Sequence, residues 1–364
     1  MRSFSILFCV LVFCQFASAF TVSIPVDIPI LPIGIVTGVT SGHEEITRQS
    51  LVLLDKYFKS KNINLDNLSP EILTEKEVSF IGASGLTTEN AIIRGNYATD
   101  LPFNLVEYFN LPNWYHDYKG SWTNNPSVQV LHFLRNIDDG DILVSQRKTC
   151  ETARANIIKS SVDGLNLWHL GKIRSALFLF GHASHTIQDS FSNAHTKRED
   201  DNEDHNLINV CYYGRSRDTR IPTCTHAIAD FRDDIWIGNP LDLIKRVIAQ
   251  FLPSEEFKED ALKSTAVLAR SATLRYFYLI MDFLLKSKEE PPDGIGVLSF
   301  LISNLFEGRT GVDAIDRGLA LDDINVPLVM PHGIMNCSGL NDEDEHAPVR
   351  PLNTASQKSR QGHP

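Results

Sequence analysis

The stretch GHASHTIQDSFSNAHT, residues 181–196, places three histidines and an aspartate close together in the chain. His182, His185 and Asp189 recur at spacings of three and four residues, which puts them on one face of an α-helix. The preceding residues 177–180 are all apolar, so this helix is predicted to be buried. Because His185 and Asp189 are one helical turn apart, both side chains can reach the same point beside the helix.

A buried carboxylate at Asp189 requires a compensating positive charge. In one interpretation, Asp189 pairs with a protonated histidine, and the remaining histidines are core side chains with satisfied hydrogen bonds. In the other, neutral imidazole nitrogens and an ionised Asp189 bind a divalent metal ion. His195 follows six residues after Asp189, and the segment THAIADF adds His226 and Asp230. These additional ligand-type residues favour a metal site.

The spacing of apolar residues elsewhere predicts a mostly α-helical protein, organised as one domain with long connecting loops. Helices are predicted over 42–58, 151–170, 172–191, 253–288 (the longest) and 295–308, while 70–110 reads as a short helix among loops. The helices over 151–170 and 172–191 follow one another almost directly, so we expect an antiparallel pair. Patterns typical of β-strands are scarce.

The two ends of the chain differ from the predicted helical domain, which spans 42–338. Residues 1–19 read as a secretory signal peptide that is cleaved after Ala19, because a basic residue, a short apolar core and small residues follow in order. Residues 20–41 form an apolar segment whose prolines favour an extended chain. No later stretch reads as a transmembrane segment, and 339–364 is polar enough to predict a disordered tail. The sequence therefore predicts a secreted, extracellular protein.

Secretion places the remaining cysteines in an oxidising compartment, where an even number suggests disulfide bonds. We pair Cys211 with Cys224, which flank one polar loop, and Cys150 with Cys337 by elimination. Asn67 and Asn336 each begin an Asn-x-Ser pattern, as expected for a glycoprotein.

The formal net charge of the whole chain is −11, and loss of Arg2 with the signal peptide makes it one unit more negative. An acidic chain has no general electrostatic attraction for nucleic acid or for an anionic membrane.

The central stretch resembles the corresponding helix of the zinc-dependent phospholipase C/P1 nuclease superfamily. That helix carries a His, an Asp four residues later, a short turn and a further His, which His185, Asp189 and His195 match. Other short segments resemble further ligand-bearing parts of the superfamily: GHEEIT with His43, RGNYATDLP with Asp100, SVQVLHFLR with His132, and THAIADF with His226 and Asp230. The resemblance covers about Gly42 to Asp230 and is closest to the secreted and Het-C-like branches.

This resemblance implies the multi-helix fold of the superfamily and up to three Zn²⁺ ions. It implies that Asp189 bridges two of the ions and that Asp100, besides ligating, accepts a proton as the catalytic residue. The implied ligands are His132, His185, Asp100 and Asp189 for one ion, His195, His226 and Asp230 for a second, and His43 with Asp189 for a third. His116, in NWYHDY, competes with His132, which is preferred because it directly precedes the paired helices. His182 stands where the superfamily has an apolar residue, so it is expected to pack behind the ligands.

The function implied by the resemblance is that of a secreted zinc-dependent phosphodiesterase, with phospholipid preferred over nucleic acid as substrate because the chain is acidic. The alternatives are a single-strand nuclease-like hydrolase and a non-catalytic Het-C-like recognition or matrix protein with structural zinc. A metal-free helical domain is the remaining interpretation. One departure bears on the third ion: enzymes of the superfamily use their mature N-terminal residue as a ligand, whereas Phe20, the predicted new N-terminus, stands well before His43.

Overall fold

The computed structural model describes residues 42–72, 90–100, 126–135, 143–193, 195–199, 205–212, 264–286, 294–308 and 333–340. Within these ranges the chain is mostly helical, as predicted. The helices are α2 (Gly42–Ser60), α4 (Ala91–Asp100), α7 (Pro126–Leu131), α8 (Gln146–His169), α9 (Ile173–Asp189), α12 (Ser264–Lys286) and α13 (Gly294–Glu307), with a 3-10 turn at Leu65–Asn67. Two short strands, β1 (Thr196–Arg198) and β2 (Leu207–Val210), pair antiparallel.

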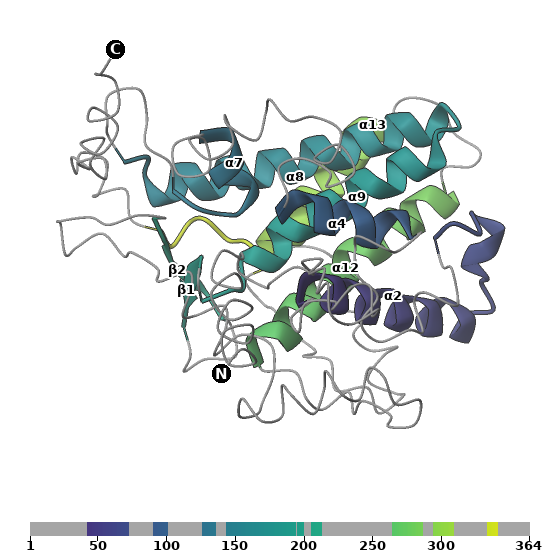
Figure 1. Ribbon diagram of the computed structural model, residues 1–364, viewed down its shortest axis with the longest axis horizontal. Helices are drawn as coiled ribbons and strands as arrows, with labels where there is room; N and C mark the ends of the chain where they lie inside the picture. The colour runs from purple at the N-terminus through teal and green to yellow at the C-terminus, as the bar shows by residue number, and fades with distance from the viewer. Residues whose placement is uncertain are drawn as a thin grey trace, which may run out of the picture.

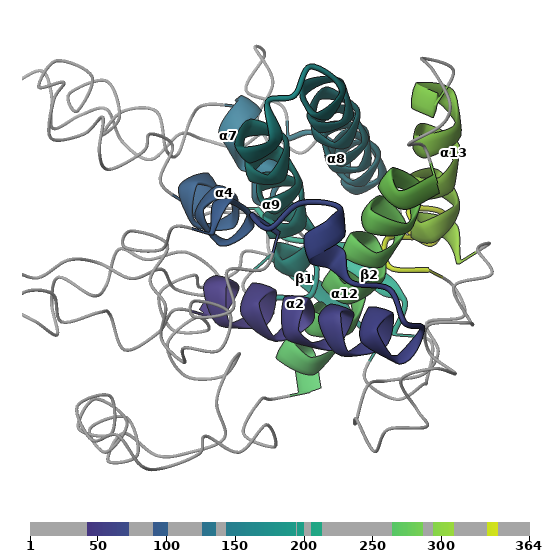
Figure 2. The ribbon, with the colours of Figure 1, turned by 90° about the vertical axis from the view of Figure 1, so that its right-hand side faces the viewer.

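Helix α9 lies at the centre of the helical assembly. It packs against α8, which runs beside it after a tight turn, and against α4, α12 and α2 (Figures 1 and 2). Figure 2 shows α4 lying along α9 on one side, while α2 and α12 lie beneath it. This position explains why α9 is apolar on most of its surface: Leu177, Phe180 and Ile187 are fully buried.

The ends of the paired helices follow local capping chemistry. The hydroxyl of Ser145 accepts a hydrogen bond from the backbone N–H of Lys148, so α8 begins at Gln146, five residues before the predicted start. The helix ends at the turn that contains Gly171, where φ is +72° and a residue without a side chain is favoured. This turn reverses the chain into α9, and the predicted antiparallel pair is present.

Close contact between α4 and α9 depends on two glycines. A Cβ atom at Gly181 would lie 1.9 Å from the carbonyl oxygen of Ile92, and one at Gly95 would lie 1.9 Å from that of Phe178. The backbones of the two helices therefore touch at both positions, and any larger residue would push them apart. This close approach brings the end of α4 beside the second half of α9, where His185 and Asp189 lie.

The chain beyond α9 is held by the hairpin and by the C-terminal part of the described residues. The guanidinium of Arg198 lies over the ring of Phe191 and donates hydrogen bonds to the carbonyl oxygens of Ser190 and Ile334. A disulfide joins Cys150 of α8 to Cys337, which confirms the predicted pairing. These bonds hold residues 333–340 and the turn after Asp189 against the helical core.

Several predicted features lie wholly or partly outside the described residues, among them the signal peptide, the apolar segment 20–41 and Cys224. Cys211 is itself disulfide-bonded. Leu340 is buried, and its carbonyl oxygen accepts a hydrogen bond from Arg147. Among the described helices, none has the length and apolar character needed to cross a bilayer.

Candidate metal centre

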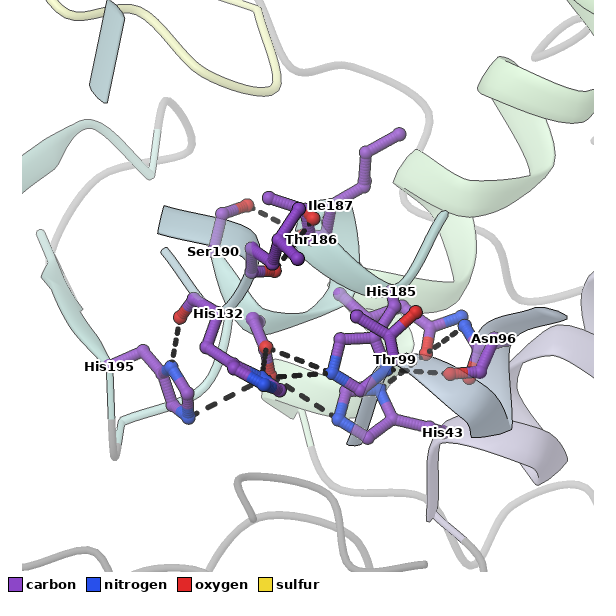
Figure 3. Close-up of polar contacts among 12 residues, drawn as sticks. His43, Asn96, Thr99, His132, His185, Thr186, Ile187, Ser190 and His195 are labelled. Carbon is purple, nitrogen blue, oxygen red and sulfur yellow. Dashed lines mark hydrogen bonds and ion pairs between the residues drawn. The ribbon is translucent and has the colours of Figure 1, made fainter. Parts of the chain in front are cut away.

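The carboxylate of Asp189 is fully buried at the end of α9 and is surrounded by imidazole rings. On one side, Oδ2 lies 3.1 Å from Nδ1 of His132 and 3.1 Å from Nε2 of His185. On the other side, Oδ1 lies 3.3 Å from Nε2 of His43 and 3.7 Å from Nε2 of His195. Figure 3 shows the four rings converging from different directions, joined by dashed contacts. Residues far apart in the chain thus meet at one carboxylate.

Each ring comes from a different local structure. His43 is in the first turn of α2, and His185 lies one turn before Asp189 on α9. His132 directly follows α7, where Phe133 takes a left-handed backbone conformation (φ +52°) and turns the chain away. His195 follows the turn after α9, and its carbonyl oxygen accepts a hydrogen bond from the N–H of Cys211. Helix α9 carries His185 and Asp189, whereas the other three rings come from segments outside it.

Hydrogen bonds to backbone carbonyls fix the orientation of two of these rings. Nδ1 of His185 donates to the carbonyl oxygen of Asn96 at 3.0 Å, and Nδ1 of His195 donates to the carbonyl oxygen of His132. A carbonyl oxygen can only accept, so the proton of each neutral ring is on Nδ1. In both rings Nε2 therefore presents a lone pair toward Asp189. Metal-binding histidines are commonly held in this way, with the second ring nitrogen donating to a carbonyl or carboxylate.

Without a cation, the negative charge of the buried Asp189 carboxylate must be balanced by protonation of a neighbouring imidazole. Burial alone opposes ionisation of Asp189, but the charges of His195, His185 and His43 and the hydrogen bond with His132 outweigh it and hold the pKa of Asp189 well below its ordinary value. One protonated imidazole is enough to neutralise the ionised carboxylate. The rings of His43 and His185 stack with centroids 3.9 Å apart, so protonating several rings would place like charges in contact inside the protein.

If they are neutral, His185 and His195 have Nε2 lone pairs that face carboxylate oxygens of Asp189, which is repulsive unless a cation lies between them. The distances agree with that requirement. His132 Nδ1, His185 Nε2 and Asp189 Oδ2 form a triangle with sides of 3.1, 3.1 and 3.3 Å. Ligands in tetrahedral zinc sites, with bonds of about 2.0–2.1 Å, lie about 3.3 Å from one another. His43, His185 and Asp189 also offer ligand atoms within 4.8 Å of one another. The residues present thus fit a divalent ion of the zinc type.

The structure brings together His43, His132, His185, Asp189 and His195 from the set predicted by sequence. Asp100 is the last residue of α4, a helix that contacts α9, and only its backbone position is described. His116, His226 and Asp230 lie outside the described residues.

His182 packs behind the ligands, as expected from the sequence. Its Nδ1 lies 2.6 Å from the hydroxyl of Thr99, which itself donates to the carbonyl of Gly95. Burial, and then the charges of His185 and His132, lower the pKa of His182 from 6.5 to about 4. This ring is therefore neutral at physiological pH.

Sequence reasoning did not find the buried amides and hydroxyls beside the metal-type ligands. Asn96 of α4 and Gln188 of α9 are fully buried, and the amide of Asn96 donates to both Ser184 and Gln188. Gln188 immediately precedes Asp189, and a glutamine adjacent to a candidate ligand on a buried helix was the available signal. Its role depends on partners in α2 and α4 that no local pattern identifies.

Compared with models of protein families, with curated proteins and with solved structures, the chain matches none.

Proposed function

We propose that this chain is a secreted, zinc-dependent phosphodiesterase, with phospholipid as the preferred class of substrate and single-stranded nucleic acid as the alternative. The observation that carries the proposal is the convergence of four imidazoles on the buried carboxylate of Asp189, at 3.1–3.7 Å. The resemblance of the segments around His43, Asp100, His132, His185, Asp189 and His195 to the zinc-dependent phospholipase C/P1 nuclease superfamily supports the reaction class.

We assign the metal-binding and proton-accepting roles to the following residues. His132, His185 and Asp189 would hold one ion, and His43 and His195, which face the other oxygen of Asp189, would ligate the others. His226 and Asp230 are proposed to complete the second ion's ligands, and Asp100 to accept a proton. Zinc bound in such a cluster lowers the pKa of water and neutralises the charge that develops on a phosphodiester during cleavage.

A second candidate function, a non-catalytic secreted protein with structural zinc, is favoured by one specific observation. Asp189 and the rings of His43, His185 and His195 are 0 % exposed, and His132 is 3 % exposed. Structural zinc sites have every coordination position filled by protein ligands and need no access for water or substrate, whereas catalytic sites keep one position open.

Metal analysis of the purified mature protein, combined with a substrate panel, separates these functions. The panel contains an activated phosphodiester, neutral phosphatidylcholine vesicles and a single-stranded oligonucleotide. The proposal predicts two or three zinc ions per chain and turnover that disappears with a chelator and returns with Zn²⁺. One tightly bound zinc without turnover on any of the three substrates would favour the structural role. No bound metal at all would contradict both.

A further inference from the structure

The side-chain amide of Gln188 joins the three helices that bring ligands or their carbonyl partners to the centre. Its Oε1 lies 2.7 Å from Nδ1 of His43 on α2 and accepts from the amide of Asn96 on α4 at 3.2 Å. Its Nε2 donates to the hydroxyl of Thr47, one turn after His43, at 2.9 Å. Gln188 itself is fully buried on α9, next to Asp189. One amide therefore holds α2 at two successive turns.

One backbone carbonyl, that of Gly181, fixes which group donates and which accepts in the hydrogen bonds that link Ser184, Asn96, Gln188 and His43. The hydroxyl of Ser184 donates to the carbonyl oxygen of Gly181 at 2.7 Å, so it must accept from Asn96. The amide nitrogen of Asn96 therefore also faces Gln188, whose nearest atom must be the acceptor Oε1.

The same reasoning assigns the proton of His43. Because Oε1 of Gln188 can only accept, Nδ1 of His43 carries the proton and donates to it. The neutral ring then has its lone pair on Nε2, the atom that lies 3.3 Å from Oδ1 of Asp189. If the proton were on Nε2 instead, the lone pair of Nδ1 would face Oε1 of Gln188, which is also an acceptor. Nε2 would then carry a proton and could not bind a metal ion.

We propose that Gln188 is a positioning residue that makes His43 a metal ligand, because it holds the tautomer in which the lone pair of Nε2 faces Asp189. This proposal deepens the metal centre proposed above and rests on it for its functional consequence. Groups that orient a ligand histidine in this way typically contribute 10–100-fold to metal affinity. Gln188 would contact a bound ion through no atom of its own, so it would act through the residues that it bonds, and most directly through the ring of His43.

Two substitutions separate hydrogen bonding from packing. Gln188→Met keeps the length of the side chain and removes the acceptor, whereas Gln188→Glu keeps an acceptor for His43 and Asn96 and lets the Thr47 hydroxyl donate instead. Gln49→Met is the matched control, because Gln49 is also a buried amide at a contact of α2, bonded to Glu45 and Arg270 and to no candidate ligand.

The first measurement is the tautomer of His43 in metal-free protein, by long-range ¹H–¹⁵N NMR. Wild type and Gln188→Glu should show the proton on Nδ1, and Gln188→Met should lose this preference. The second is the dissociation constant of Zn²⁺, which should rise about 10–100-fold in Gln188→Met. It should stay at or below the wild-type value in Gln188→Glu and be unchanged in Gln49→Met.

An unaltered tautomer in Gln188→Met would overturn the inference, and so would equal losses of affinity in Gln188→Met and Gln49→Met, since general loosening of the fold would then explain both. Failure of the metal centre itself has a different signature. Wild type would then bind no Zn²⁺, while the NMR comparison would still decide whether Gln188 sets the tautomer of His43.

Discussion

Gly181 of α9 packs directly against the carbonyl group of Ile92 on α4, so closely that a Cβ atom at Gly181 would lie 1.9 Å from the Ile92 oxygen. This contact sets how far the end of α4 can approach α9. The same approach lets the carbonyl of Asn96 accept the hydrogen bond that orients His185. The geometry of the proposed centre thus depends on a backbone contact that contains no ligand.

Gly181→Ala should therefore destabilise the protein by about 1–3 kcal/mol, the usual cost of overpacking, because the obstructing atoms belong to a backbone that cannot rotate away. Zn²⁺ affinity should fall as well, since α4 moves away from His185. Chemical denaturation and metal titration measure the two effects.

Gly296→Ala on α13 provides the control for this substitution. A Cβ atom at Gly296 meets nothing within 4 Å, so the higher helix propensity of alanine should leave stability unchanged or slightly increased. If Gly181→Ala behaves like Gly296→Ala, the two helices are not in the contact described here.

Removing the disulfide by the double change Cys150→Ser and Cys337→Ser should lower the free energy of unfolding by about 2–5 kcal/mol. The bond joins residues 187 positions apart and fastens 333–340, whose Ile334 carbonyl accepts from Arg198. Urea unfolding of the oxidised wild type and the double variant measures the difference. Equal midpoints and slopes would show that the segment is held without the covalent bond.

His182 should make stability depend on pH below neutrality. Burial lowers its pKa in the folded protein from 6.5 to about 4. Between these values the unfolded chain binds a proton that the folded protein does not, so lowering the pH shifts the equilibrium toward the unfolded state. Stability contributed by the neutral ring is thus present above pH 6.5 and is lost as the pH falls toward 4.

The test for this residue compares wild type with His182→Gln, in a chelator, by thermal denaturation between pH 7 and 4. Glutamine does not titrate but can still donate to Thr99, so wild type should lose more stability than the variant across this range. Parallel curves for the two proteins would mean that His182 does not titrate differently in the two states.

The sequence predicted those parts of the structure that local patterns determine. His185 and Asp189 share a helix face because they are four residues apart, and α8 and α9 pair because so few residues separate them. The Cys150–Cys337 bond followed by elimination, once Cys211 and Cys224 had been paired across one loop. A helix was predicted over 253–288, and α12 is described from Ser264 to Lys286, since 253–263 lie outside the described residues.

Other features depend on contacts between distant segments, which no local pattern shows. The α4–α9 contact requires Gly95 and Gly181 to face each other, and single glycines in a helical pattern do not reveal such a pairing. Strands β1 and β2 are three and four residues long, too short to show an alternating pattern. The tautomer of His43 follows from a chain of hydrogen bonds through Asn96 and Gln188, which exists only after α2, α4 and α9 have packed.

The most direct test of the metal centre is the zinc content of wild type and Asp189→Asn, purified in parallel and measured by elemental mass spectrometry. Asp163→Asn, which changes an exposed carboxylate of α8 that pairs with Lys159, is the control. Because both oxygens of Asp189 face imidazoles and asparagine carries no charge, the account predicts bound zinc in wild type and Asp163→Asn and its loss from Asp189→Asn. Equal zinc in all three proteins, or none in any of them, would contradict it.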